Sequence, residues 1–175
     1  MRTDVVFTLT GPDRIGIVEE VTGALYELGG NVGTSRMARL GGEFAILMLV
    51  ALPDDRRADL DAAFAPLVAQ GYKVTIGLTD AEKSAGHVGW LPYEVLVTGA
   101  DHEGIVHEVA AGLSRLGINI ESAETSTSEA PISGTPLFTM IARVAVPPSV
   151  DETDWISALS TAGDESNVDI EVTAL

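Results

Sequence analysis

One short pattern of glycine and polar residues occurs twice in the chain and has the chemistry to bind a small zwitterion. The pattern Gly-x-Asp-x-x-Gly-Ile-Val spans residues 11–18 and again 99–106, and each copy is followed by Leu-Gly-x-Asn. A glycine in the first turn of a helix, such as Gly16 or Gly104, lets a small anion approach the free backbone N–H groups. The Asp three residues earlier can accept hydrogen bonds from an ammonium group, and the Asn supplies a neutral donor and acceptor. Together these groups suit a free α-amino acid.

Each of these residues also has a purely structural interpretation. Asp13 and Asp101 precede a predicted helix, where Asp commonly caps the first turn. The two glycines would also allow the helix to pack closely on a sheet. Asn31 and Asn119 follow helix-ending glycines, where Asn serves as a turn residue. Recurrence of all three residue types in both copies favours the functional interpretation, although a duplication preserves structural residues as well.

The remaining reactive residues form no recognisable catalytic or metal-binding motif. Residues 11–16 have the outer spacing of a phosphate-binding loop, but Ile17 and Val18 stand where that loop needs Lys and Ser or Thr. There is no Cys, and His102 and His107 fall on different faces of a helix. We therefore expect no metal, no cofactor and no enzymatic activity. A small basic group in the first copy is expected to pair with nearby Glu side chains: Arg14, Arg36 and Arg39.

Length, composition and charge exclude several classes of protein. The chain has 175 residues, of which 46% are apolar and 21% charged, so it can bury a core. Ten basic and 26 acidic residues give a formal net charge of −16, which argues against a direct nucleic-acid interface. The longest apolar runs, 44–52 and 138–146, are shorter than the roughly 20 residues of a membrane span. The acidic start is unlike a signal peptide, so we expect a cytoplasmic protein with no membrane contact.

The chain contains the same unit twice. At an offset of 88, 12 of the 22 residues from 10 to 31 are identical in the second copy, far more than chance gives. Phe44 and Pro53 match Phe138 and Pro147 at an offset of 94, so the second copy has a six-residue insertion. The Pro, Ser and Gly content of residues 129–134 places this insertion in a loop.

Hydrophobic periodicity predicts the order β-α-β-β-α-β in each copy. In the first copy, strands are expected at 4–10, 31–40, 43–52 and 72–78, and helices at 15–28 and 55–70. In the second copy, strands are expected at 93–98, 119–128, 136–146 and 167–173, and helices at 103–116 and 151–161. This order gives a four-stranded antiparallel sheet with both helices on one face, and its open face and edges invite pairing. We predict an α+β protein with a first domain at 1–80, a linker at 81–92 and a second domain at 93–175.

These residues resemble a known family of ligand-sensing domains. Thr-Gly-Pro-Asp-Arg-Ile-Gly-Ile-Val at 10–18, followed by Leu-Gly-Gly-Asn-Val at 28–32, resembles the opening of an ACT domain. The run Ser-Arg-Met-Ala-Arg-Leu-Gly-Gly-Glu-Phe at 35–44 is similar to tandem ACT proteins of the glycine cleavage system transcriptional repressor type. The resemblance covers residues 1–80 and 93–175. The second copy departs from it, because His102-Glu103 replaces Arg14-Ile15 and Ser-Ala-Glu at 122–124 replaces Ser-Arg-Met.

The resemblance implies two tandem ferredoxin-like domains that sense an amino acid, such as glycine, at ACT–ACT interfaces. It further implies a partner that is a DNA-binding activator protein rather than DNA itself. Because the open sheet face and edges invite pairing, we expect the chain to form a homodimer. Carried over to this chain, the ligand-binding residues are Asp13, Gly16, Ile17, Asn31, Asp101, Gly104, Ile105 and Asn119.

Three functional hypotheses remain open from the sequence. The first is a non-enzymatic amino-acid sensor that modulates a transcriptional or enzyme partner. The second is an acidic protein-interaction module without a small ligand, whose charge steers a basic partner. The third is an enzyme on a ferredoxin-like sheet, which lacks support because no nucleophile–base pair or metal cluster can be assembled.

Overall fold

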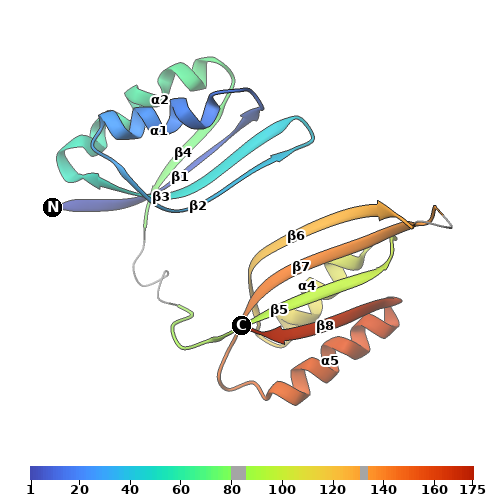
Figure 1. Ribbon diagram of the computed structural model, residues 1–175. Coiled ribbons are helices and arrows are strands. Elements are labelled where there is room, and N and C mark those ends of the chain that lie inside the picture. The colour runs from blue at the N-terminus through green and yellow to red at the C-terminus, as the bar shows by residue number, and fades with distance from the viewer. Residues whose placement is uncertain (80–85, 131–133) are drawn as a thin grey trace. The chain divides into compact units, whose positions relative to one another are not determined.

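The computed structural model describes residues 1–79, 86–130 and 134–175. It divides the chain into two compact units, Met1–Ser84 (unit 1) and Ala85–Leu175 (unit 2), which have the same element order (Figure 1). The predicted linker at 81–92 falls partly on residues outside the described ranges, and its last two positions belong to the first strand of unit 2. Residues 131–133 of the predicted insertion loop also lie outside the described residues.

Unit 1 is a four-stranded antiparallel sheet with two helices on one face (Figure 1). The strand order is β2-β3-β1-β4, so β2 and β4 form the edges. Its elements are β1 (Arg2–Pro12), α1 (Ile17–Glu27), β2 (Asn31–Leu40), β3 (Glu43–Pro53), the 3-10 helix η1 (Asp54–Asp59), α2 (Leu60–Ala69) and β4 (Lys73–Leu78).

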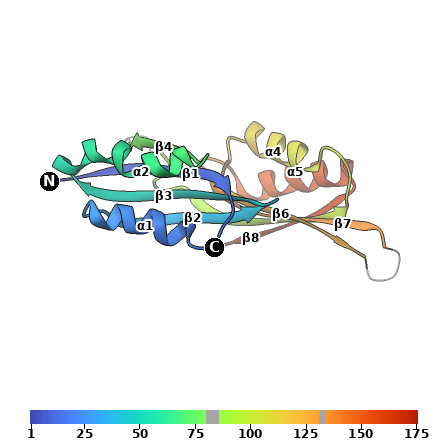
Figure 2. The ribbon, with the colours of Figure 1, turned by 90° about the horizontal axis from the view of Figure 1, so that it is seen from above.

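Unit 2 repeats this arrangement with the strand order β6-β7-β5-β8. Its two helices lie side by side over one face of the sheet, as do those of unit 1 (Figures 1 and 2). Its elements are β5 (Leu91–Ala100), α4 (Ile105–Arg115), β6 (Asn119–Glu129), β7 (Pro136–Val146), α5 (Glu152–Glu165) and β8 (Val168–Ala174). The predicted α+β fold with two ferredoxin-like units is confirmed.

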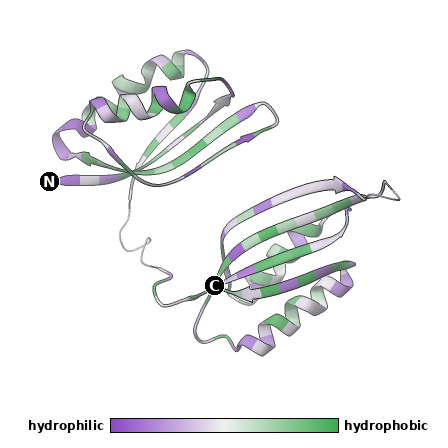
Figure 3. Cartoon of the chain, in the orientation of Figure 1, coloured by the Kyte–Doolittle hydropathy of each residue, from purple (hydrophilic) through white to green (hydrophobic). Residues whose placement is uncertain are grey.

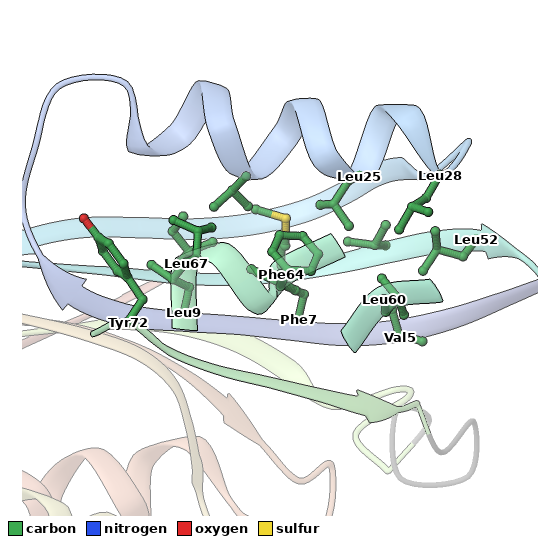
Figure 4. Packing of buried hydrophobic residues seen from close by; sticks show 14 of the residues in the cluster. Val5, Phe7, Leu9, Leu25, Leu28, Leu52, Leu60, Phe64, Leu67 and Tyr72 are labelled. Carbon is green, nitrogen blue, oxygen red and sulfur yellow. The ribbon is translucent and has the colours of Figure 1, made fainter. Parts of the chain in front are cut away.

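Alternating side chains build the core of unit 1. Val5, Phe7 and Leu9 of β1 point toward the helices and are fully buried, while the residues between them face the other side. They meet apolar residues of both helices, and the Phe7 and Phe64 rings lie 4.6 Å apart (Figure 4). The central strand β3 is among the most apolar segments of the unit (Figure 3). Burial of this face fixes the register, because a slip of one residue would expose it.

Unit 2 has a core of the same design, with a tryptophan in place of the phenylalanine pair. Trp155 of α5 is fully buried and meets the Tyr93 ring edge-on at 5.2 Å. Near its C-terminal end, α5 approaches β8 so closely that a Cβ on Gly163 would lie 2.8 Å from Ile170. This contact holds α5 in helical form to Glu165, four residues beyond the predicted end.

One edge strand of each unit, β2 in unit 1 and β6 in unit 2, carries a bulge shortly after its first residue. In β2, Val32 pairs with Val50 but Ser35 pairs with Met48, so one extra residue is inserted. In β6, Ile120 and Ser122 pair with the adjacent residues 144 and 143, so Glu121 is the extra residue. A bulge bends the strand and interrupts its ladder of hydrogen bonds.

No helix among the described residues is long and apolar enough to span a membrane.

Candidate functional site

The second glycine of the repeated pattern is required by the backbone. Gly16 has φ +89° and Gly104 has φ +100°, and each is the residue immediately before its helix. A Cβ on Gly16 would meet nothing within 4 Å, so close packing does not explain this glycine. Residues with a side chain rarely adopt this left-handed conformation, which explains the glycine in both copies.

Close packing instead explains the first glycine of the pattern, which sequence reasoning missed. A Cβ on Gly11 would lie 2.5 Å from the Tyr72 ring, and one on Gly99 would lie 2.8 Å from Val168. The Tyr72 hydroxyl donates a hydrogen bond of 2.8 Å to the Pro12 carbonyl. These contacts hold the start of the last strand against the end of the first strand. The repetition of this glycine at one fixed offset was the signal that could have found it.

The structural interpretation of the Asp residues as helix caps is wrong. Helices α1 and α4 begin at the left-handed glycines, and neither has a side-chain cap hydrogen bond among the described residues. The Asp13 carboxylate instead accepts a hydrogen bond of 2.6 Å from Arg39 Nε. In unit 2, Thr127 occupies the register position of Arg39, since Thr127 pairs with Phe138 as Arg39 pairs with Phe44.

The loop between β1 and α1 brings together three of the predicted ligand residues. Asp13, Gly16 and Ile17 line an open groove of about 530 Å³ at the start of α1, together with Arg14, Val18, Glu19, Thr22 and Phe44. Ile17 is buried in the core, as is Ile105 in unit 2, so neither side chain is open to a ligand. The helix start has uncapped N–H groups and the positive end of the helix dipole, which favour an anion.

The Asn residues lie at the other end of each sheet. Asn31 pairs with Ala51, whereas Pro12, next to Asp13, pairs with Glu43. Eight residues of β3 separate these two levels, or roughly 26 Å at about 3.3 Å per residue. Asn119 is likewise paired with Ala145, while Ala100, next to Asp101, pairs with Leu137. No single unit therefore brings the Asp, the glycine and the Asn together.

The two Asn residues have different surroundings. Asn31 is exposed, and Arg2 at this end of unit 1 donates hydrogen bonds to Gly29 O (2.6 Å) and Ala51 O (2.8 Å). Asn119 is half-buried beside the segment that precedes β5. The rings of His87 and Trp90 lie 4.4 Å apart, and His87 Nδ1 is 3.5 Å from Asn119 Nδ2.

This His–Trp pair helps to line an open groove of about 420 Å³ in unit 2. The other residues of the groove are Ala110, Ser114, Gly117, Ile118, Asn119 and Ile120. His87 and Trp90 lie in the predicted linker at 81–92, which sequence reasoning did not connect with a site. A tryptophan in an otherwise polar connecting segment was the available signal for this groove.

The loop that carries the Asp and the glycine is tied to the second helix in both units, by different residues. In unit 1, Arg14 bonds to the Glu20 carboxylate, donates a 3.3 Å hydrogen bond to Gln70 Oε1 and lies 5.7 Å from the Tyr72 ring centroid. The expected pairing of Arg14 with Glu is thus confirmed, whereas Arg39 pairs with Asp13 and Arg36 donates to the Ser35 carbonyl.

In unit 2, His102 occupies the place of Arg14. Its Nδ1 lies 3.0 Å from Glu103 O and its Nε2 lies 2.7 Å from Ser166 O. The carbonyls of Glu103 and then Ser166 raise the pKa of His102 above its ordinary value, because they favour the protonated ring. Among the described residues, no three His, Asp or Glu side chains gather in a group that could hold a metal ion.

Comparison with known proteins places this architecture. A family model described as an ACT domain matches residues 3–75. Unit 1 belongs to the ACT-domain family. A crystal structure of an unknown protein from Galdieria sulphuraria is 35% identical, with a TM-score of 0.84 over 100% of this chain and 99% of that chain.

A second solved structure shows the same fold over the full length at lower identity. A proposed glycine cleavage system transcriptional repressor has a TM-score of 0.70 and 21% identity, over 100% of this chain and 98% of that chain. Comparison with curated proteins finds no match. The fold of the chain is therefore shared along nearly the whole length of both solved structures.

Proposed function

We propose that this tandem ACT protein is a non-enzymatic regulator that senses an amino acid, such as glycine, at interfaces between ACT units. The observation that carries the proposal is the repeated loop after the first strand of each unit. It combines a left-handed glycine, an uncapped helix start and an adjacent carboxylate at Asp13 or Asp101. A ligand carboxylate suits the backbone N–H groups, and a ligand ammonium suits the Asp.

The separation of the Asn from this loop supports a site that needs two ACT units. If two β2-type edges pair in antiparallel fashion, the Asn31 end of one strand comes to the Leu40 end of the other. Arg39 at that end is bonded to Asp13, so the Asn of one unit would meet the loop of the second. A ligand seated there would favour the paired state by the difference in its affinity for the paired and unpaired states.

The proposed assembly is a homodimer in the cytoplasm that modulates a transcriptional or enzyme partner, for example a DNA-binding activator protein. The net charge of −16 supports a protein partner over direct contact with nucleic acid. The neighbour described as a glycine cleavage system transcriptional repressor has the same fold, which supports a regulatory role for this chain.

The test is a calorimetric screen of the twenty amino acids against the full chain, starting with glycine. We expect at least one to bind and to raise the Tm at millimolar concentration. D13A and D101A should each weaken binding about tenfold or more, because each removes a charged hydrogen-bond acceptor. D61A, which removes an exposed carboxylate of α2, is the matched control. If no amino acid binds, the sensor proposal fails.

Unit 2 supports one other candidate function. It has 14 acidic and only 2 basic residues, a net charge of −12, and this polarity suits a protein-interaction module for a basic partner. Such a module would bind its partner with an affinity that falls steeply with salt and does not respond to amino acids. A sensor would instead show partner binding that changes when the amino acid is added.

A further inference from the structure

Equivalent residues tie the candidate loop to the end of the second helix in each unit. Gln70 and Ser166 both follow the last turn of that helix, α2 in unit 1 and α5 in unit 2. Arg14 reaches Gln70, and His102 reaches the Ser166 carbonyl. Because the pattern of residues 11–18 recurs at 99–106, Arg14 and His102 are the same position of the repeat.

The two ties differ in how they respond to protons. An Arg guanidinium remains charged at all ordinary pH values and always donates. A neutral imidazole has one N–H, so it can donate to only one of two acceptors, whereas an imidazolium donates from both ring nitrogens. Both His102 nitrogens face backbone carbonyl oxygens, Glu103 O and Ser166 O. A carbonyl oxygen only accepts, so both contacts are hydrogen bonds only when the ring is protonated.

The charged groups around His102 also favour its protonated form. Asp101 on the same loop and Glu108 on α4 stabilise the positive charge. The groove beside Ser166 is lined by carboxylates and two basic or titratable groups: Glu108 and Glu165, with His107 and Arg115 from α4. From α5, the group that contacts the ring is the carbonyl of Ser166.

We infer that His102 is a proton-dependent latch, which fastens the Asp101–Gly104 loop to the end of α5 when the ring is protonated and loosens it when the ring is neutral. Arg14 makes the corresponding tie in unit 1 independent of pH. If the proposed ligand binds at these loops, unit 2 would respond to pH and unit 1 would not. Only that last consequence rests on the proposed function.

The direction with pH follows from the raised pKa of His102. The latch is complete below the ordinary histidine pKa of about 6.5. It is lost as the pH rises through the higher pKa of the folded protein. The pH range in which the two loops differ most therefore lies above about 6.5.

The latch is tested by NMR on the full chain without ligand. We expect His102 to titrate above about 6.5, with both ring nitrogens protonated at the acid end. The Asp101 amide bonds to Pro136 O and the Glu108 amide to Gly104 O, so both report on the loop. Their hydrogen-exchange protection factors should fall by roughly three- to tenfold on deprotonation, the range of a charge-assisted hydrogen bond weakened by solvent. Protection factors remove the intrinsic pH dependence of exchange.

Two variants that swap the equivalent residues of the two units sharpen the test. H102R should keep the loop fastened across the titration, and R14H should make the Asp13 amide of unit 1 pH-dependent in the same sense. H107Q, a neighbouring histidine of the same groove, should leave the behaviour unchanged. The inference is overturned if His102 titrates at or below about 6.5, or if wild type and H102R show the same pH dependence of loop protection. Because no ligand is used, this outcome is separate from failure of the amino-acid screen.

Discussion

Units 1 and 2 have the same fold but very different surfaces. Unit 1 has 8 basic and 12 acidic residues, a net charge of −4, whereas unit 2 has 2 basic and 14 acidic residues, a net charge of −12. The register makes the comparison residue by residue: Arg36 pairs with Leu47 and its counterpart Glu124 pairs with Ile141. The left-handed glycines and the buried face are retained in both units. Duplication has therefore kept the residues that shape the backbone, while the exposed positions have diverged in charge.

The largest expected effect separates the two cores. W155A should destabilise unit 2 by about 3–5 kcal/mol, and F64A should do the same to unit 1, because each removes a fully buried ring. Both tryptophans, Trp90 and Trp155, belong to unit 2, so tryptophan fluorescence during denaturation reports on that unit. F64A should leave this fluorescence transition in place. If it shifts the transition as much as it shifts the circular dichroism, the units do not unfold independently.

A smaller effect is expected at the left-handed glycines, where the two units should behave alike. G16A and G104A should each cost about 1–2 kcal/mol, because a Cβ disfavours the positive φ. G77A is the control, since its added Cβ meets nothing within 4 Å and its φ is not positive. Chemical denaturation of the three variants measures the cost. Equal stability of G16A and G77A would contradict a backbone role for this glycine.

Salt should affect the two units differently. Raising NaCl from about 0.01 M to about 1 M shortens the Debye length from about 30 to about 3 Å, which screens repulsion among exposed charges. We expect unit 2 to gain more stability than unit 1, by on the order of 1 kcal/mol, because of its larger net charge. Unit-specific amide exchange at both salt concentrations measures the difference. An equal gain in both units would show that their charges are not a source of self-repulsion.

The smallest effect concerns the ion pair that only unit 1 has at this position among the described residues. R39A should cost about 0.2–1 kcal/mol, since the Arg39–Asp13 pair is largely exposed. T127R places an arginine at the matching position opposite Asp101 and should stabilise unit 2 by a similar amount. A double-mutant cycle with D13A or D101A measures each coupling. A coupling of zero in T127R would show that the Asp101 loop is arranged differently from the Asp13 loop.

Most of the fold could be predicted from the sequence because its cores follow simple periodicities. The alternation through Val5, Phe7 and Leu9 and the helical spacing of Ile17, Val21 and Leu25 place most elements to within a few residues. The predicted helix at 55–70 instead begins with the 3-10 helix η1 and becomes α-helical only at Leu60. The end of α5 could not be predicted. Helix propensity disfavours Gly163, and the close packing of this glycine on β8 cannot be seen from the local sequence.

The candidate site was only half predictable. Residue type identified the loop, but not that Asp13 bonds to Arg39 from the neighbouring hairpin instead of capping the helix. The separation of Asn31 from that loop follows from topology. Strands β1 and β2 both pair antiparallel to β3 and so run in the same direction, which puts the end of one far from the start of the other. Asp13 and Asn31 are only 18 residues apart in the sequence, but the shared direction of β1 and β2 places them at opposite ends of the sheet.

The bulges early in β2 and β6 limit how far another chain can pair with these exposed edges. Each unit exposes an edge whose backbone groups could template endless addition of further chains. An extra residue at Gly33–Thr34 or Glu121 breaks the straight line of donors and acceptors. A second strand can then form a continuous ladder of hydrogen bonds only with the residues after the bulge, from Ser35 in β2 or Ser122 in β6. The bulge thus permits one partner strand to pair with part of this edge but disfavours the continued addition of strands that forms a fibril.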